Sequence, residues 1–316
     1  MCYYCGNPIE SHKNGGNLFP NLQDEVLRAN AGTNQELADY LSTSFWQDFG
    51  TSTRKYNLSN SGTFAKSGVL TYNTSGNNFD ADGLSNARSN LIDEAFKYVG
   101  KVLGINFQLT TDSNADFRFG DEQSGAYASS SVLGGYINYT NINIASNWHS
   151  GLSGFGNYTF QTILHEIGHG LGLGHQGDYN GWASYSSDAD FSNDSWQSSI
   201  MSYFSQSENT SINASYAFIS TFMSADWIAL NDLYQAQGYS TSNAFAGDTV
   251  YGVNTNISSS DCGIFNEFID LIDSTAFTIA DGSGTDTLDL SILNTNNSID
   301  LRSTQKNQTT LYASDI

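Results

Sequence analysis

The sequence predicts an α/β or α+β domain that is followed by a turn-rich β region. Over residues 31–239, short alternating apolar segments are interspersed with a few long segments of helical periodicity. Over residues 240–316 the helical periodicity is nearly lost, and short apolar clusters are separated by Ser, Thr and Asn. We therefore expect a domain boundary near residue 240.

The composition is that of a folded, strongly acidic protein. Of the 316 residues, 39% are hydrophobic and 13% aromatic, which is enough to form a core. The net charge of -21 comes from 32 Asp and Glu against 11 Lys and Arg, and such a surface repels nucleic acids and anionic lipids. No apolar run reaches the roughly 18 residues of a membrane span. Three cysteines do not make a disulfide framework in a chain of this size.

The chain begins with a polar segment that we expect to be a leader or propeptide, residues 1–30. It contains both prolines of the chain and has neither the basic nor the apolar region of a cleaved signal peptide. The protein either stays inside the cell or leaves by a route that does not read the N-terminus. A first helix is predicted over residues 34–48 from the spacing of Leu37, Leu41 and Phe45, with Asn34 as its N-cap.

The remaining elements of the first domain alternate between the two periodicities. A second long helix is predicted because Leu91, Phe96 and Val99 fall on one helical face. In chain order, strands are expected at 55–58, 68–72, 106–110, 115–119 and 125–129, and helices at 84–103, 160–172 and 223–237.

Three of the five histidines lie within the eleven residues of the segment HEIGHGLGLGH, which starts at residue 165. On a helix His165 and His169 share one face, with roughly 5–6 Å between their Cβ atoms, so both imidazoles can reach one ion. Glu166 projects toward a different side of the helix, where it suits a base for a bound water better than a ligand.

The third histidine requires the helix to end. His175 is six residues beyond His169, too far along the axis of an uninterrupted helix, and Gly172 can supply the break. Three neutral imidazoles leave a fourth zinc position for water, as in catalytic zinc sites. A bare H-E-x-x-H can occur by chance, but the full pattern is far more restrictive. The sequence therefore predicts a catalytic zinc site.

With these residues, and with the segment SIMSYF at residues 199–204, the chain resembles the metzincin metalloproteases and, among them, the serralysin-type alkaline proteases of bacteria. The resemblance implies an α+β metzincin catalytic domain, with a twisted mixed sheet, long helices and a zinc cleft. It also implies that Met201 forms an apolar floor under the zinc and that Tyr203 stabilises the transition state. Gln176 stands where the family commonly has Pro, and we expect it to loosen the turn without disturbing the ligands.

The resemblance continues into residues 240–316, where the segments 247–252 and 281–289 match the start of the family's calcium-binding parallel β-roll. An all-oxygen ligand set suits calcium, a hard cation. A solvated Asp-Gly turn is the alternative reading. The implied ligands are the backbone oxygens of Phe245, Gly247 and Thr249, opposite Asp281, Ser283, Gly284 and Asp286.

The leader contains a possible inhibitor of the zinc site. Cys5, Gly6 and Pro8 have the C-G-x-P form of the cysteine switch in matrix metalloproteinase propeptides. In a zymogen, the Cys5 thiolate would take the fourth zinc position and displace water. A Cys2–Cys5 disulfide and a disordered tail are the alternatives.

The resemblance implies a secreted, monomeric zinc endopeptidase that acts on proteins and peptides. In the family, export occurs in one step through a C-terminal signal, and this chain stops at Ile316 before that region, so we expect a truncated or processed form. A substrate would lie extended and antiparallel to an edge strand near residues 125–129. The alternatives are a non-catalytic or latent zinc and calcium adhesion protein, which the intact Glu166 disfavours, and a zinc amidase acting on non-protein amides.

Overall fold

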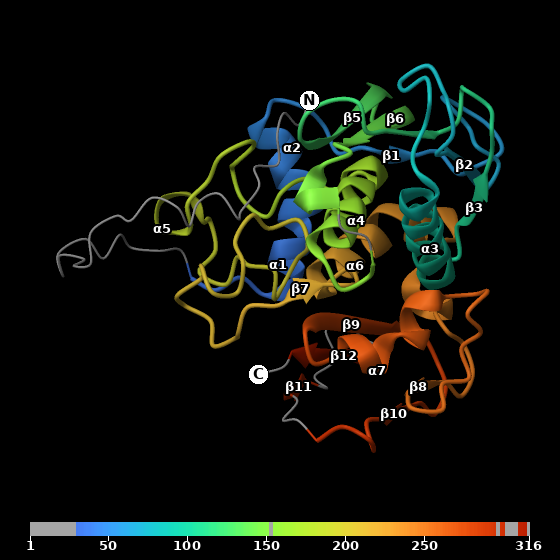
Figure 1. Cartoon of the computed structure of the whole chain (residues 1–316). Helices are drawn as coiled ribbons and strands as arrows, with labels where there is room; N and C mark the ends of the chain where they lie inside the picture. Colours follow the sequence, from blue (N-terminus) through green and yellow to red (C-terminus); the bar gives the residue numbers. More distant parts are fainter. Residues whose placement is uncertain (1–29, 152–153, 295–297, 301–308, 315–316) are drawn as a thin grey trace.

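The computed structural model describes residues 30–151, 154–294, 298–300 and 309–314. Its main sheet has six strands in the order β1-β6-β4-β2-β3, with β5 on the opposite side of β6 (Figure 1). All pairs are parallel except that of β5 with β6. The strands are β1 (Lys55–Tyr56), β2 (Val69–Asn73), β3 (Asn106–Leu109), β4 (Phe117–Gly120), β5 (Ala126–Leu133) and β6 (Tyr136–Ile144).

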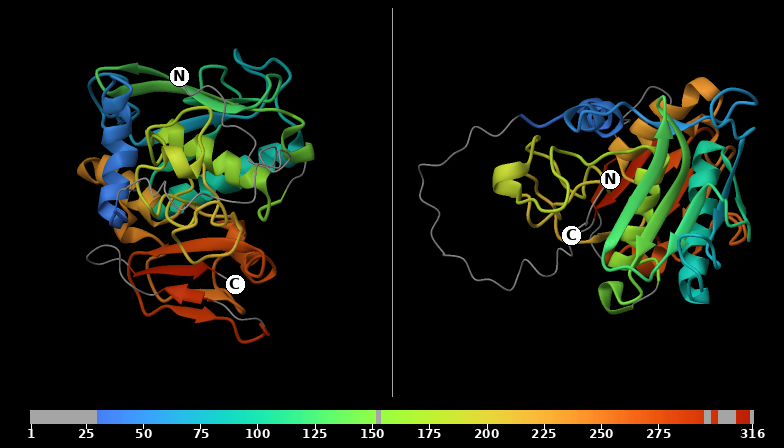
Figure 2. Two further views of the ribbon diagram at one scale, coloured as in Figure 1. Left: turned by 90° about the vertical axis from the view of Figure 1, so that its left-hand side faces the viewer. Right: turned by 90° about the horizontal axis from the view of Figure 1, so that it is seen from above.

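The predicted long helices are confirmed. The first begins as α1 (Asn34–Asp39), passes through a π-helical turn and ends as α2 (Phe45–Asp48). The others are α3 (Asn86–Leu103), α4 (Tyr158–Leu171) and α6 (Ser224–Tyr234). Helix α4 packs against β5 and β6 on one side and contacts α3, while α6 contacts α1 (Figures 1 and 2). A short α5 (Tyr185–Asp188) lies in the long connection between α4 and α6.

The expected N-cap of the first helix is wrong by one residue. Thr33, which is extended at φ -67° and ψ 159°, accepts a hydrogen bond from the Glu36 amide, and its own amide donates to the Glu36 carboxylate at 2.7 Å. This reciprocal capping box satisfies two backbone donors, whereas Asn34 is already inside the helix.

Strand β6 was missing from the predicted elements although it is central to the sheet, where it pairs with β1, β4 and β5. The alternation of Ile137 and Tyr139 with polar residues shifts by one position at Thr140 and Asn141, before Ile142 and Ile144. Asn143, a polar residue of this strand, is nevertheless buried and donates hydrogen bonds to the carbonyls of Gln123 and Gly125. Alternation of hydrophobicity alone therefore does not reveal the strand.

The C-terminal region forms two smaller sheets below the main one (Figure 1). In one of them, β7 (Phe218–Ile219) pairs in parallel with β9 (Thr275–Asp281), and β9, β12 (Thr309–Ser314) and β11 (Ser298–Asp300) are antiparallel. In the other, β8 (Val250–Gly252) pairs in parallel with β10 (Thr287–Asp289). The short helix α7 (Phe268–Leu271) precedes β9.

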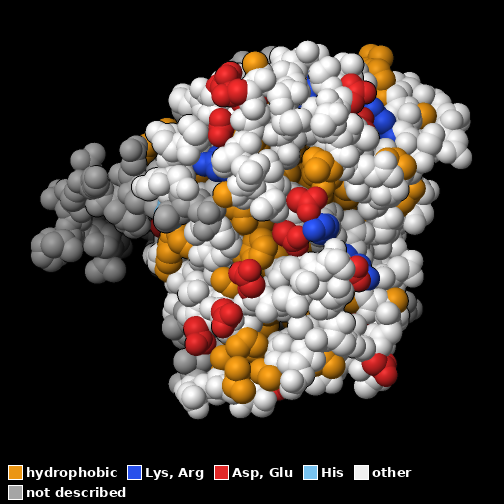
Figure 3. Space-filling view, turned by 45° about the vertical axis from the view of Figure 1, so that its right-hand side comes forward, with side chains coloured by type: hydrophobic (Ala, Val, Ile, Leu, Met, Phe, Trp, Pro, Cys, Tyr) orange, Lys and Arg blue, Asp and Glu red, His pale blue; other side chains and the backbone are white. Residues whose placement is uncertain are grey.

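The buried core is continuous across residue 240. One hydrophobic cluster includes residues of the main domain, such as Phe222 and Trp227, together with Phe265 and Phe277 of the C-terminal region. A domain boundary near residue 240 stays a prediction. Figure 3 shows one face of the molecule, on which acidic side chains are scattered. Among the described helices, none is long and apolar enough to cross a membrane.

Candidate metal centre

Helix α4 carries two of the three clustered histidines and is fixed at both ends. At its start, the Asn157 side chain accepts hydrogen bonds from the amides of Thr159 and Phe160. At its end, Gly172 adopts φ +114°, in the left-handed region. A Cβ at Gly172 would lie 2.1 Å from the Arg54 carbonyl oxygen, so both the turn and the close packing require glycine.

The three histidines converge as their spacing predicted. Their ligand nitrogens all lie within 4.8 Å of one another, and the Nε2 atoms of His169 and His175 are 3.0 Å apart. Each Nδ1 lies 2.8 Å from a backbone carbonyl, which can only accept a hydrogen bond. Each Nδ1 therefore carries the proton, and each Nε2 is left to face the centre with a lone pair. The accepting carbonyls belong to Ile200, Leu173 and Tyr179.

Burial keeps the imidazoles of His169 and His175 in the form that binds metal. His165, His169 and His175 are all buried, and desolvation lowers the pKa of His169 and His175 well below the usual range, with a further contribution from the neighbouring imidazoles. Neutral imidazole is the form that ligates zinc. The three Nε2 atoms, on rings that are each held in place through Nδ1, fit a zinc ion with one open position. Glu166, next to His165 on α4, is fully buried.

Met201 packs directly against the metal-binding helix. Its side chain is fully buried, and its sulfur would lie only 2.7 Å from a Cβ placed on Gly168, the residue before His169. Gly168 thus allows the methionine to approach the helix backbone between the two ligands. The apolar floor under the zinc that the resemblance implies for Met201 stays a prediction.

A buried carboxylate that the sequence analysis missed holds the Met201 loop. Asp226 of α6 accepts hydrogen bonds from the Ser199 hydroxyl at 2.6 Å, the Ile200 amide at 2.8 Å and the Met223 amide at 2.8 Å. Burial raises the pKa of Asp226 to about 7. Because the Ile200 carbonyl accepts the His165 hydrogen bond, Asp226 positions that ligand through the loop. The only sequence signal was an acidic residue at the third position of a helix.

The third ligand is held in a similar way by Asp194. Its carboxylate accepts a hydrogen bond from the Tyr179 hydroxyl, at 3.1 Å to one oxygen and 3.3 Å to the other, and the Tyr179 carbonyl accepts the His175 hydrogen bond. Burial raises the pKa of Asp194 to about 7. Neither residue had been singled out as a site residue.

Tyr203 lies beside the histidines. Its ring centroid is 4.4 Å from that of His175 and 6.4 Å from that of His165, and its hydroxyl oxygen accepts a hydrogen bond from the Gly181 amide at 3.2 Å. The phenol is therefore within the same cluster of rings as the predicted zinc ligands.

Comparison with known proteins identifies the same relatives as the motifs do. No family model matches the chain. The metallopeptidase AprA of Pseudomonas marginalis is 40% identical over 152 residues, 46% of this chain and 30% of that protein. Serralysin of Proteus mirabilis is 33% identical over 63% of this chain and 38% of its own length, and serralysin C of Dickeya chrysanthemi is 35% identical over 57% and 35%. The resemblance to the serralysin-type metalloproteases is confirmed.

The similarity covers only part of each protein. The matched region spans between 30% and 38% of the length of these serralysin-type relatives. Among solved structures, high choriolytic enzyme 1, a hatching enzyme zinc-protease from the medaka fish Oryzias latipes, matches 39% of this chain and 54% of its own, with 18% identity and a TM-score of 0.26. A score this low carries no argument. The mixed sheet, long helices and three-histidine cluster nevertheless fit a metzincin catalytic domain.

The departure from the serralysin-type pattern at Gln176 does not have the expected effect. The side chain of Gln176 is fully buried, and its amide nitrogen donates a hydrogen bond to the Leu37 carbonyl of α1 at 3.1 Å. The expectation that the turn after His175 is loosened is therefore wrong, because glutamine ties it to the first helix.

The two predicted calcium segments lie together. The Gly247 amide donates to the Ser283 carbonyl and the Thr249 amide to the Asp286 carboxylate, each at 2.9 Å. A Cβ on Gly284 would be only 2.2 Å from the Gly247 carbonyl oxygen. The segments that a serralysin-type β-roll would use are thus in direct contact.

The remaining members of this set also take part in local hydrogen bonds. The Phe245 carbonyl accepts from the Thr249 hydroxyl at 2.8 Å. The Asp281 carboxylate accepts from the Tyr251 hydroxyl at 2.7 Å and from the Ser283 amide at 3.1 Å, and burial raises the pKa of Asp281 to about 6. A cavity of about 220 Å³ adjoins Phe245, Gly247 and Thr249. Cys5 and the rest of the proposed switch lie outside the described residues.

Proposed function

We propose that this protein is a zinc-dependent endopeptidase that hydrolyses internal peptide bonds of proteins, with zinc held by His165, His169 and His175. The observation that carries the proposal is the convergence of three buried imidazoles whose Nδ1 atoms are fixed by backbone carbonyls. The names metallopeptidase and serralysin of the relatives support it. When bound, zinc would supply a Lewis acid that polarises the scissile carbonyl and lowers the pKa of water.

The proton transfers are assigned to Glu166. As general base it takes a proton from the attacking water, and as general acid it returns that proton to the leaving amine. Its position next to His165 on α4, in a fully buried environment, supports this role. Tyr203 is assigned as the donor of a hydrogen bond to the carbonyl oxygen as negative charge develops there. Its ring contact with His175 is the supporting observation.

The substrate is proposed to lie extended along β5. Among the described strands, β5 pairs only with β6, so its other edge can accept a peptide strand. Antiparallel pairing would let main-chain hydrogen bonds supply much of the affinity, which gives broad sequence preference.

The decisive experiment compares the wild-type protein with a Glu166→Gln variant on casein. We expect wild-type hydrolysis that a zinc chelator blocks and added zinc restores, and at least a hundredfold loss in the variant, the usual effect of removing a general base. Zinc content by mass spectrometry should stay the same in both proteins. A zinc-loaded wild-type protein that cleaves a small amide but no protein would favour an amidase, and one that cleaves neither would favour an adhesion protein.

The C-terminal assignments extend the proposal. Residues 31–239 are assigned to the catalytic domain and residues 240–316 to the beginning of a calcium-binding β-roll. The parallel β8–β10 pair and the contact of segments 247–252 and 281–289 support this assignment. The proposed calcium ligands are Phe245, Gly247, Thr249, Asp281, Ser283, Gly284 and Asp286.

The leader, residues 1–30, is assigned as a propeptide whose Cys5 inhibits the zinc site, in a monomeric protein that is secreted. The C-G-x-P motif and the serralysin-type relatives support these assignments. A Cys5→Ala variant is expected to self-process faster than the wild-type protein, with a Cys2→Ala variant as the control. Unchanged latency in Cys5→Ala would contradict the switch.

A further inference from the structure

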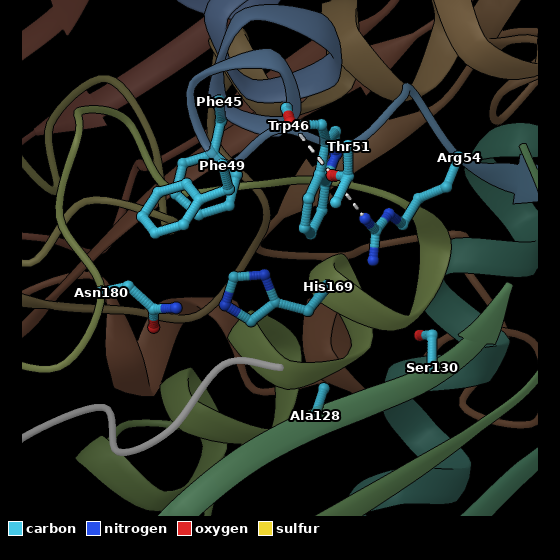
Figure 4. Close-up of a pocket in the computed structure, with 9 residues that line it drawn as sticks. All are labelled: Phe45, Trp46, Phe49, Thr51, Arg54, Ala128, Ser130, His169 and Asn180. Carbon is cyan, nitrogen blue, oxygen red and sulfur yellow. Dashed lines mark hydrogen bonds between the residues drawn. The ribbon is translucent and has the colours of Figure 1, made fainter.

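A cavity of about 150 Å³ lies against His169, so the proposed zinc site forms one of its walls (Figure 4). Aromatic rings from α2 form the opposite wall, and β5 contributes small side chains. A cavity of about this size can hold a benzene-sized group. The lining residues used here are Phe45, Trp46, Phe49, Arg54, Ala128 and Ser130.

Arg54 is the charged residue of this cavity. Its guanidinium carbon lies 3.6 Å from the centroid of the Trp46 ring, and one terminal nitrogen donates to the Thr51 hydroxyl at 2.9 Å. Its Nε is buried without a hydrogen-bond partner among the described residues. Arg54 also takes part in none of the ion pairs that these residues form.

A cation of this kind is unexpected in a protein with 32 acidic and 11 basic residues. Partial burial of a guanidinium costs solvation energy, which a carboxylate partner ordinarily offsets. The planar fork of arginine binds a carboxylate through two hydrogen bonds, and the Trp46 ring already fixes the plane of the fork. Arg54 is therefore suited to an external carboxylate.

The directions of α4, β5 and β6 indicate which end of a bound peptide would lie at the cavity. Two contacts show how α4 runs relative to β6. Trp148, just after the end of β6, donates a hydrogen bond to the Thr162 hydroxyl in the first half of α4. Thr140, in the middle of β6, lies 3.5 Å from a Cβ placed on Gly170 near the end of α4. Helix α4 thus runs opposite to β6 and in the same direction as β5. A peptide antiparallel to β5 carries its N-terminal residues toward Ser130, the end of α4 and the cavity.

We propose that this cavity is a substrate subsite for an acidic side chain, located on the N-terminal side of the cleaved bond, and that Arg54 binds the carboxylate. The aromatic rings of α2 would pack against the methylene groups of a glutamate. This inference rests on the proposed endopeptidase function, because it takes β5 as the strand that pairs with the substrate.

The first test uses three series of quenched fluorescent peptides, and each series varies one of the three positions before the cleaved bond. In one of these series, the wild-type kcat/KM should be about tenfold higher for the Glu peptide than for the Gln peptide, the effect of one charge-assisted hydrogen bond. Arg54→Gln should abolish this ratio, and Arg54→Lys should retain part of it. Arg118→Gln is the matched control, because Arg118 also stacks on a ring, that of Tyr139, but lies on β4 outside the cavity. A wild-type preference for Phe over Glu would overturn the proposal.

The second test separates binding from turnover. In the Glu166→Gln background, fluorescence anisotropy of labelled, otherwise identical peptides should show tighter binding of the Glu peptide than of the Gln peptide, again by about tenfold. Adding Arg54→Gln should remove the difference. Cleavage without any preference for Glu would refute the subsite alone. Glu-dependent binding, together with a wild-type protein that cleaves no peptide, would refute the proposed function and would support only the binding of a carboxylate by Arg54.

Discussion

Removal of the Asp226 carboxylate tests whether the Met201 loop depends on α6. In Asp226→Ala, three buried donors lose their acceptor: the Ser199 hydroxyl and the amides of Ile200 and Met223. At about 1–2 kcal/mol for each unsatisfied donor, the free energy of unfolding should fall by about 3–6 kcal/mol. Zinc affinity should fall as well, because the Ile200 carbonyl that orients His165 is no longer fixed.

The Asp226→Asn variant should lose less stability than Asp226→Ala. The Asn carbonyl can still accept from the amides of Ile200 and Met223, which share one oxygen of Asp226. Its NH₂ group can donate to the Ser199 hydroxyl, so the loss should be only about 1–2 kcal/mol. Asp232→Ala is the control on the same helix, because within the described residues the Asp232 carboxylate accepts hydrogen bonds from two exposed glutamine side chains, so its loss should change stability little.

The assay is urea unfolding of the zinc-loaded protein, combined with zinc competition against a chromogenic chelator. The order of stability should be wild type, then Asp226→Asn, then Asp226→Ala. If Asp226→Ala unfolded at the same urea concentration as Asp232→Ala and bound zinc equally well, the reasoning that links α6 to His165 would be refuted.

Three further predictions follow from the same contacts. The folded-state pKa of Asp226 is raised to about 7 from 3.8, so its contribution to stability is fully present below about pH 4 and is lost as the pH rises through 7. The free energy of unfolding of the wild type relative to that of Asp226→Asn, measured by urea unfolding, should therefore fall from pH 4 to pH 7. Gly172→Ala should lower the free energy of unfolding by about 3–4 kcal/mol, because φ is +114° and the new Cβ would lie 2.1 Å from the Arg54 carbonyl oxygen. Gly104→Ala is the control: its φ is +77° but the Cβ would enter open space, so the loss should be only about 1–2 kcal/mol. Equal losses in urea unfolding would contradict the steric argument. Zinc at about 1,000 times its Kd should raise the free energy of unfolding by about 4 kcal/mol in the wild type, and calorimetry should detect no such effect in His175→Ala.

The parts of the site that the sequence predicted are those encoded locally. The spacing of His165 and His169, and the glycine that ends the helix before His175, follow from helix geometry within eleven residues. Both the convergence of the histidines and the ends of α4 agree with that reasoning. The long helices were also predictable, because their apolar faces repeat over many turns.

What the sequence did not predict depends on contacts between distant segments. Asp226 lies 26 residues from Ile200, and Asp194 lies 15 residues from Tyr179, so only the folded chain brings each pair together. The error at Gln176 is similar: its buried partner, Leu37, is 139 residues away. Strand β6 was missed for a different reason, since the alternation of its apolar residues shifts by one position at Thr140 and Asn141.

The proposed subsite adjoins the C-terminal end of α4, the helix that carries His165 and His169. The Trp46 indole nitrogen donates to the Gly172 carbonyl at 2.8 Å, and the Arg54 carbonyl packs closely against Gly172. The backbone that ends α4 is thereby held by two residues whose side chains line the cavity beside His169. A change in the Trp46 side chain should therefore alter both substrate preference and the orientation of the third zinc ligand. A change confined to the end of the Arg54 side chain should alter preference alone, because its contact with Gly172 is made by the backbone.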